Sequence, residues 1–135
     1  MREVTTSSAA ETEALGEEMG AGLKLGDLVL LAGALGSGKT TFVRGMARGA
    51  GSDAQVQSPT FQLVRVYPGR VQLAHVDLYR VKAAGELADL GLDDLLDEGA
   101  MVIEWGDRLD MRNGKVVTFE NLGEDRRRLR FESEP

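Results

Sequence analysis

The stretch Gly33-Ala34-Leu35-Gly36-Ser37-Gly38-Lys39-Thr40 decides the fold of this chain, because it fits the phosphate-binding pattern G-x-x-x-x-G-K-[ST] at every fixed position. The apolar run at 28–32 has the length of a buried strand, and residues 41–48 carry apolar side chains at helical spacing. A strand, a glycine-rich loop and a helix in this order are the context that the pattern requires. The stretch therefore predicts a nucleotide phosphate site.

The residue types of this loop suit a triphosphate. Gly33, Gly36 and Gly38 allow tight turns and positive φ angles, so that successive N–H groups can form a nest for phosphate oxygens. The helix that follows begins with unpaired N–H groups, which also favour an anion. Lys39 supplies a positive charge for the outer phosphates, and Thr40 offers a hydroxyl group to Mg²⁺.

The composition limits what the protein can be. A chain of 135 residues with 42% hydrophobic residues predicts one domain, here the P-loop domain spanning 1–135. The absence of cysteine and the single histidine argue against disulfides and a dedicated zinc site. A net charge of −6 argues against free-standing nucleic-acid binding by a basic surface, although a local basic patch remains compatible with it. Since we find neither a membrane-spanning apolar run nor a signal core, we expect a cytoplasmic protein without membrane contact.

The hydrophobic pattern along the chain predicts an α/β fold. We expect a three-layer sandwich like that of P-loop NTPases, with a mostly parallel central sheet and added antiparallel hairpins. The pattern favours a short edge strand within 2–8, and then a helix at about 10–22 with Ser8 as its cap and Glu11 completing a capping box. The helix face expected to pack on the sheet carries Ala14, Leu15, Glu18, Met19 and Leu23. The remaining elements are a hairpin of strands 61–67 and 71–77, short helices within 85–97 that break at Gly91, a strand at 100–105, and a second hairpin of strands 115–122 and 126–132.

Two predicted strands end in an acid. Asp77 closes the run 73–77, and Glu104 closes the run 101–104. Ligands of open α/β sheets collect at the carboxyl ends of strands, so a carboxylate there can hold Mg²⁺ directly or through water, or orient an attacking water. Which of these roles belongs to Asp77 and which to Glu104 is left open by the sequence.

Three further residues have two interpretations each. Thr60 lies in the loop Ser58-Pro59-Thr60, which is either a switch that senses the γ-phosphate or an ordinary turn. Trp105 is either a core aromatic or a ring that stacks on a base at a strand end. His75 is expected to pack inside, but it faces the same side of its strand as Asp77 and could orient the site.

The C-terminal strand is rich in arginine. Arg126, Arg128 and Arg130 share one face, and Arg127 shares the other with Leu129 and Phe131. We interpret this strand as a solvated edge strand that charge protects from pairing. A docking face for an acidic partner or for RNA is the alternative.

Taken together, the motifs resemble those of one family. They occur in the order Gly33–Thr41 with Phe42-Val43-Arg44-Gly45, Ser58-Pro59-Thr60-Phe61, His75-Val76-Asp77-Leu78-Tyr79-Arg80, Glu86-Leu87 with Leu90-Gly91-Leu92, and Ile103-Glu104-Trp105. This combination is similar to the bacterial TsaE family, formerly YjeE, over roughly residues 8–110. The combined motifs are far more specific than the phosphate loop alone.

The resemblance implies an ATPase of low intrinsic activity that uses ATP and Mg²⁺. Such a protein is needed for threonylcarbamoyladenosine modification of tRNAs reading A-starting codons. It acts on a heterodimer of TsaB and TsaD, which carries out the transfer, so its contact with tRNA is expected to be indirect.

The resemblance also implies roles for particular residues. Lys39, Asp77 and Glu104 would be catalytic, and the metal would lie at Thr40, Glu104 and Asp77. The nucleotide-binding residues would be Gly33, Ala34, Leu35, Gly36, Ser37, Gly38, Lys39, Thr40, Thr41, Thr60 and Trp105. The base would be contacted from somewhere within Thr6 to Thr12.

Three other functions compete with this one. A small-molecule kinase would need an acceptor pocket and an arginine-rich lid, of which the short chain shows no clear sign. A GTPase switch would need an N-K-x-D stretch to recognise guanine, and the sequence has none. A non-hydrolysing nucleotide-binding subunit is less well supported, because both Asp77 and Glu104 are present.

Overall fold

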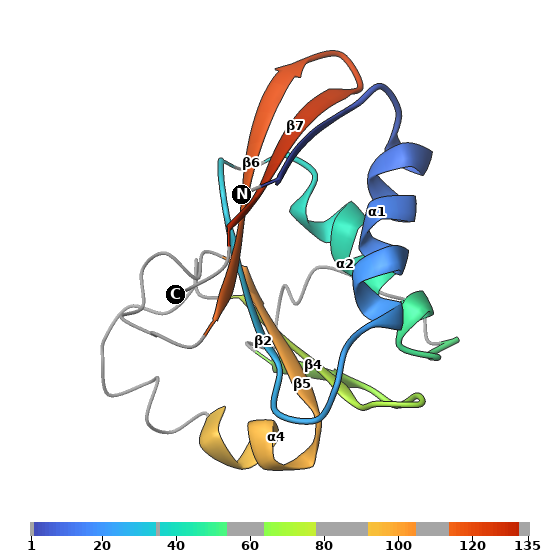
Figure 1. Cartoon of the computed structure of the whole chain (residues 1–135), viewed down its shortest axis with the longest axis vertical. Coiled ribbons are helices and arrows are strands. Elements are labelled where there is room, and N and C mark those ends of the chain that lie inside the picture. Colours follow the sequence, from blue (N-terminus) through green and yellow to red (C-terminus); the bar gives the residue numbers. More distant parts are fainter. Residues whose placement is uncertain (1, 35, 54–63, 78–91, 105–113, 133–135) are drawn as a thin grey trace.

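The computed structural model describes residues 2–34, 36–53, 64–77, 92–104 and 114–132. These residues form one seven-stranded sheet with the strand order β1-β7-β6-β2-β5-β4-β3, together with three helices (Figure 1). The elements are β1 (Arg2–Thr6), α1 (Ala9–Ala21), β2 (Leu28–Ala32), α2 (Lys39–Gly49), β3 (Val64–Tyr67), β4 (Leu73–Asp77), α4 (Leu92–Glu98), β5 (Ala100–Glu104), β6 (Lys115–Gly123) and β7 (Arg126–Glu132).

The centre of the sheet is parallel and its flanks are antiparallel. β2 lies between β6 and β5 and runs parallel to both, and β5 runs parallel to β4. β3 pairs with β4, β7 with β6 and β1 with β7 in the antiparallel sense. This confirms the predicted α/β fold, including both hairpins. All five residues of Leu28–Ala32 are buried. A parallel strand that is covered on both faces needs apolar residues at successive positions, which explains the continuous apolar run in the sequence.

Two separate cores cover the two faces of the sheet. One contains Val29 and Leu31 of β2 together with Phe42 and Met46 of α2, and it is the face on which α1 and α2 lie. The other contains Leu28 and Leu30, against which Leu95 and Leu96 of α4 pack. Figure 1 shows α1 and α2 on one side of the sheet and α4 on the other, so β2 is enclosed from both sides.

Helix α1 is anchored at both ends by side chains. The Ser8 hydroxyl accepts the N–H of Glu11 at 3.1 Å, as predicted for the helix cap. The Glu11 carboxylate accepts the N–H of Ser7, also at 3.1 Å, so the capping box closes one residue earlier than expected. At the other end, the Arg70 guanidinium donates to the carbonyl oxygens of Gly20, Ala21 and Leu23, at and just beyond the last turn of the helix.

The prediction for the packing face of α1 was right in part: Leu15 and Met19 pack against the core and Leu23 is buried in it, whereas Ala14 and Glu18 are exposed. The buried residues of α1 are Thr12, Gly16 and Gly20, a stripe of small side chains four residues apart, whereas Leu15 and Met19 are only partly buried. This stripe lies on α2, where Gly45 and Gly49 have the same spacing. A Cβ atom would lie 2.1 Å from the Phe42 carbonyl oxygen at Gly16 and 1.9 Å from the Glu13 carbonyl oxygen at Gly45. The two helix backbones are therefore in direct contact, and α1 covers the helix that follows the phosphate loop.

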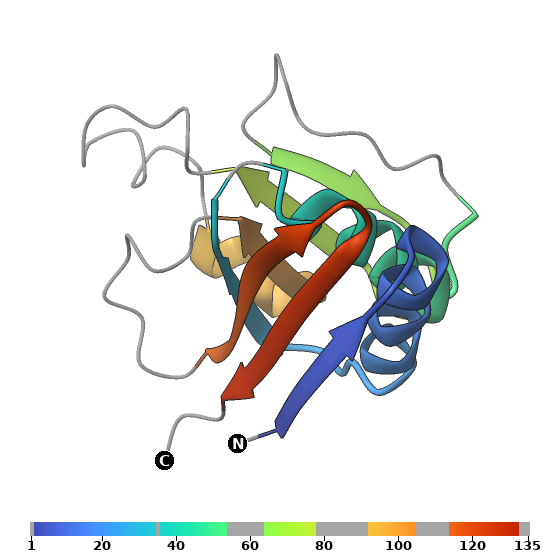
Figure 2. The ribbon, with the colours of Figure 1, turned by 90° about the horizontal axis from the view of Figure 1, so that it is seen from above.

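Strand β7 is not the edge strand that the sequence suggested. β1 pairs with it along its length, from Arg2 opposite Phe131 to Thr6 opposite Arg127, and β1 is the outer strand (Figure 2). Arg128 and Arg130 form ion pairs with Glu3 on β1, and Arg128 also pairs with Glu120 on β6. These arginines thus join neighbouring strands.

Several expected features lie outside the described residues. They are the first part of the strand 61–67, the helical segment before Leu92 with its break at Gly91, and position 105 of the strand 100–105. Within the described ranges, no helix combines the length and the hydrophobicity needed to cross a membrane.

Candidate functional site

The predicted phosphate loop connects β2 to α2 at the carboxyl end of β2. Gly33, Gly36 and Gly38 have φ angles of 140°, 75° and 103°, a region that residues with side chains rarely adopt. Gly38 is the residue before α2, and within the described structure no side chain caps this helix. The first N–H groups of α2 are thus available to an anion, which is the arrangement that binds phosphate at helix N-termini.

Two polar side chains point into this loop from buried positions. Lys39 is 4% exposed, and its ammonium group donates to the carbonyl oxygen of Gly33 across the loop. Ser37 is 1% exposed, and its hydroxyl group finds no hydrogen-bond partner among the described residues. A buried hydroxyl without a partner is unfavourable, and a phosphate oxygen would supply the missing acceptor. The loop therefore fits a polyphosphate by backbone shape and by side-chain chemistry.

The two predicted acids lie side by side. Asp77 on β4 is directly opposite Glu104 on β5, and Glu104 is opposite Leu31 on β2, two residues before the phosphate loop begins. Leu31 belongs to the core that faces α2, so both carboxylates point toward the side of the sheet where α2 lies. Asp77 and Glu104 are 7% and 5% exposed, an unusual degree of burial for acids.

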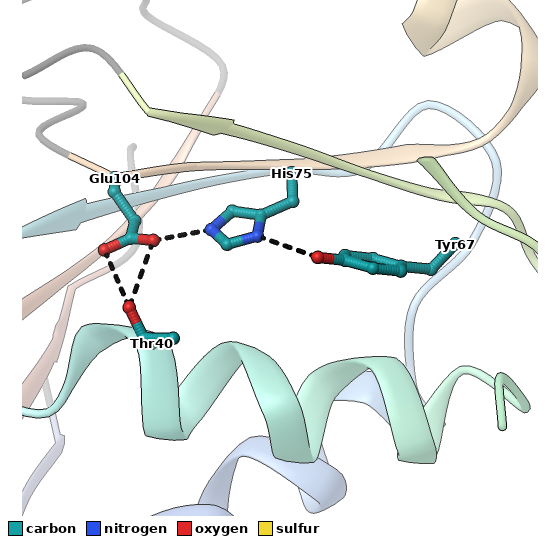
Figure 3. Close-up of polar contacts among 4 residues, drawn as sticks. All are labelled: Thr40, Tyr67, His75 and Glu104. Atoms are coloured by element: carbon teal, nitrogen blue, oxygen red, sulfur yellow. Dashed lines mark hydrogen bonds and ion pairs between the residues drawn. The ribbon is translucent and has the colours of Figure 1, made fainter. Parts of the chain in front are cut away.

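A chain of polar contacts connects the loop helix to the sheet (Figure 3). The Thr40 hydroxyl lies 3.5 Å from both carboxylate oxygens of Glu104. One of these oxygens also lies 2.5 Å from Nε2 of His75, whose Nδ1 is 3.4 Å from the Tyr67 hydroxyl. The sequence predicted that His75 packs inside, and left open a role in orienting the site. The structure shows it buried and in contact with Glu104.

The residues beside the phosphate loop offer oxygen atoms of the kind that Mg²⁺ takes as ligands. Within the described ranges, no group of three or more histidine, cysteine, aspartate or glutamate residues is arranged to hold a metal ion. Mg²⁺ commonly takes one or two carboxylates, with phosphate oxygens and waters completing its octahedron. Thr40, Glu104 and Asp77 offer oxygen ligands of this kind beside the phosphate loop.

A small pocket adjoins the phosphate loop. It is lined by Ala9 and Thr12 of α1, Gly38 and Thr41 of the loop and its helix, and Asp125 and Arg127 of the β6–β7 hairpin. Of the segment expected to contact the base, Ala9 and Thr12 line this pocket. Thr6 contacts one of these residues, because its buried hydroxyl group lies 2.7 Å from that of Thr12.

The β6–β7 hairpin also contributes to the site, which the sequence did not predict. The Asn121 amide donates to the Gly36 carbonyl oxygen at 3.4 Å, and a Cβ atom at Gly38 would lie 3.7 Å from Cγ of Arg127. The hairpin therefore borders the phosphate loop. No local sequence signal could have shown this, because the contact depends on how β6 pairs with β2.

The structure brings most of the predicted site residues together. The carboxyl ends of β2, β5 and β4 are close to four of them, namely Lys39, Thr40, Asp77 and Glu104. The loop and the start of α2 beside them contain Gly33, Ala34, Gly36, Ser37, Gly38 and Thr41. Leu35, Thr60 and Trp105 lie outside the described residues, so their predicted roles stay predictions.

Comparisons with known proteins point to one family. The family described as "Threonylcarbamoyl adenosine biosynthesis protein TsaE" matches residues 6–129. The chain is 44% identical over 122 residues to the tRNA threonylcarbamoyladenosine biosynthesis protein TsaE of Streptomyces coelicolor, a match that covers 87% of this chain and 76% of that protein. It is 35% identical over 134 residues to the protein of the same description from Aquifex aeolicus, covering 97% and 96% of the two chains.

A solved structure shows the same architecture. The crystal structure of Bacillus subtilis YdiB superposes with a TM-score of 0.79 at 28% sequence identity, and the match covers 99% of this chain and 86% of that one. The family match spans nearly the whole sequence, and the phosphate loop and both strand-end acids lie within it. The chain therefore belongs to the TsaE family.

Proposed function

We propose that this protein is a Mg²⁺-dependent ATPase required for threonylcarbamoyladenosine modification of tRNAs reading A-starting codons. In this proposal it acts on the TsaB–TsaD complex, does not catalyse the transfer itself, and is located in the cytoplasm. The observation that carries the ATPase part is the meeting of the Thr40 hydroxyl with the buried Glu104 carboxylate beside a glycine-rich phosphate loop. The pathway is supported by the names of its relatives, which are tRNA threonylcarbamoyladenosine biosynthesis proteins.

In this function the loop holds the phosphates of ATP. The N–H groups at the start of α2 and the Ser37 hydroxyl would bind phosphate oxygens, and Lys39 would neutralise charge on the outer phosphates. Residues that bind the charge developing in the transition state more strongly than the ground state accelerate phosphoryl transfer. Lys39 is placed for this task because it is buried, where its charge is weakly screened.

Thr40, Glu104 and Asp77 would hold Mg²⁺. When bound, the ion would supply positive charge to offset the negative charge of the phosphates during hydrolysis. Glu104 and Asp77 lie opposite each other at the carboxyl ends of neighbouring strands, so one could bind the metal while the other orients the attacking water. Either assignment is compatible with their burial.

The nucleoside half of ATP would lie in the pocket next to Gly38. Thr41 is the residue after Thr40, and it lines this pocket together with Thr12 and Arg127. Hydroxyl and guanidinium groups there can bind the polar edges of a base or a ribose. In this proposal the base contact expected within Thr6 to Thr12 would come from Ala9 or Thr12, because both line the pocket.

The action on TsaB–TsaD requires that nucleotide states differ in affinity. A ligand shifts a conformational equilibrium only by the difference between its affinities for the two states. The ATP and ADP forms must therefore bind the pair with different strengths, or hydrolysis would have no effect on it. Partner residues could also complete the site, which would explain a low intrinsic rate.

The test is ATP hydrolysis with Mg²⁺, measured alone and after adding the TsaB–TsaD pair from the same source. Lys39→Ala removes the phosphate-binding charge, and Lys24→Ala is the matched control, because Lys24 is an exposed lysine in the turn before β2. We expect the pair to stimulate hydrolysis by the unmodified protein and by Lys24→Ala, but not by Lys39→Ala. Vigorous hydrolysis that is indifferent to the pair would refute the partner role, and phosphorylation of an added small-molecule acceptor would indicate a kinase instead.

A further inference from the structure

The single histidine of the chain contacts Glu104, one of the candidate metal ligands. His75 on β4 is fully buried, and its Nε2 lies 2.5 Å from one carboxylate oxygen of Glu104. Its Nδ1 lies 3.4 Å from the hydroxyl group of Tyr67 on the neighbouring strand β3. In Figure 3 the imidazole ring stands between these two side chains, with Glu104 reaching on toward Thr40.

The contacts define which atom donates to which. An ionised carboxylate only accepts hydrogen bonds, so Nε2 of His75 carries the proton in its contact with Glu104. In the neutral ring, Nδ1 then accepts a hydrogen bond from the Tyr67 hydroxyl. The imidazole orientation is thus specified on both sides, by a charged acceptor at short distance and by a more distant donor.

Glu104 needs such a partner more than most glutamates. A glutamate side chain at a strand end has three rotatable bonds, so fixing its carboxylate in one direction costs conformational entropy. Its contact with Thr40 is long, at 3.5 Å to each oxygen, whereas its contact with His75 is short. The direction of the carboxylate is therefore determined mainly by His75.

We propose that His75 is a positioning residue, which holds the Glu104 carboxylate beside Thr40 so that the metal ligands are arranged before Mg²⁺ and nucleotide bind. This inference rests on the proposed function, because it assumes that Glu104 serves a metal. Partners that orient a metal ligand typically change metal affinity by about 10–100-fold when they are removed. The competing explanation is that His75 only fills space in the interior.

Substitutions at position 75 separate these explanations. His75→Phe keeps an aromatic ring of similar volume but removes the donor to Glu104. His75→Gln keeps an N–H group at about the distance of Nε2, whereas the shorter side chain of His75→Asn does not extend that far. Tyr67→Phe removes only the more distant contact of the ring, at 3.4 Å, and keeps the contact between His75 and Glu104, so it shows how much that distant contact adds.

The main readout is metal affinity at equilibrium. Mn²⁺ is titrated in place of Mg²⁺ and followed by electron paramagnetic resonance, with saturating ADP present, and ADP binding without metal is measured in parallel. We expect His75→Phe and His75→Asn to weaken Mn²⁺ binding about 10-fold or more. We expect His75→Gln and Tyr67→Phe to stay within about 3-fold of the unmodified protein, and metal-free ADP affinity to stay within about 2-fold for all four.

The outcomes distinguish this inference from the function on which it rests. If the unmodified protein binds ADP and Mn²⁺ but His75→Phe and His75→Asn bind Mn²⁺ equally well, His75 only fills space and the inference is wrong. If His75→Phe does not fold, the comparison of Gln with Asn decides in the same way. If the unmodified protein shows no nucleotide-dependent Mn²⁺ binding at all, the proposed metal site fails, and the inference fails with it.

Discussion

The contact between α1 and α2 allows a quantitative test with Gly16→Ala. The added Cβ atom would lie 2.1 Å from the Phe42 carbonyl oxygen, whereas such atoms essentially never approach closer than 3.0 Å. The methyl group cannot rotate away and its neighbour is backbone, so α1 must move from α2 by about 1 Å, at a cost near the upper end of the usual 1–3 kcal/mol for overpacking. Alanine gains about 1 kcal/mol over glycine in a helix interior. The net expectation is a loss of about 2 kcal/mol in the free energy of unfolding.

The assay is urea unfolding followed by circular dichroism, with the slope m compared between variants. A loss of about 2 kcal/mol corresponds to a fall in Tm of roughly 6–10 °C for a chain of this size. Gly22→Ala is the matched control, because a Cβ atom there would meet only the Met19 carbonyl oxygen, at an ordinary 3.7 Å, and we expect a change within about 0.5 kcal/mol. A Gly16→Ala protein as stable as the unmodified one would mean that the two backbones are not in contact.

Two further predictions concern the phosphate loop and the metal. Ser37→Ala should stabilise the nucleotide-free protein by about 1 kcal/mol, because it removes a buried hydroxyl group without a partner in the described structure. The same substitution should weaken ATP binding, and thermal unfolding with and without ATP measures both effects. A variant that binds ATP normally would contradict the role of this hydroxyl group. Glu104→Ala should retain some ATP binding but lose Mg²⁺-dependent hydrolysis, as should the unmodified protein after removal of Mg²⁺ by EDTA. Hydrolysis by Glu104→Ala at the unmodified rate would rule out the metal role.

Much of the architecture could be predicted because its signals are local. The run 28–32 forms β2 as predicted, and the alternating stretches around Pro68-Gly69 form β3 at 64–67 and β4 at 73–77, within the predicted strands 61–67 and 71–77. Each of these stretches combines a hydrophobic period with turn residues. The candidate site followed from two strands that end in acids, because parallel strands bring their carboxyl ends to one edge. The register that places Asp77 opposite Glu104 was then a consequence of the fold.

The packing of α1 could not be predicted in the same way. Apolar periodicity identified Leu15 and Met19, which do pack against the core, because large side chains dominate any hydrophobicity pattern. The direct contact with α2 is made by Gly16 and Gly20, which carry no hydrophobic signal. Their spacing gains its meaning only from the matching pair on α2, and the sequence does not say that these two helices cross there.

The remaining differences have long-range causes. The position of β7 inside the sheet depends on β1, which comes from the opposite end of the chain. The contact of His75 with Glu104 joins residues 29 positions apart, so the sequence could place His75 inside without identifying its partner. The approach of Asn121 to Gly36 spans 85 positions and has no local signal.

Equilibrium binding of ATP, ADP, AMP and adenosine shows whether the loop Gly33–Thr40 holds the phosphates of ATP. We expect affinity to fall steeply as phosphates are removed, and we expect Lys39→Ala to abolish this dependence while Lys24→Ala retains it. Adenosine or AMP binding as tightly as ATP, or a folded Lys39→Ala variant with the unmodified order of affinities, would contradict this role of the loop.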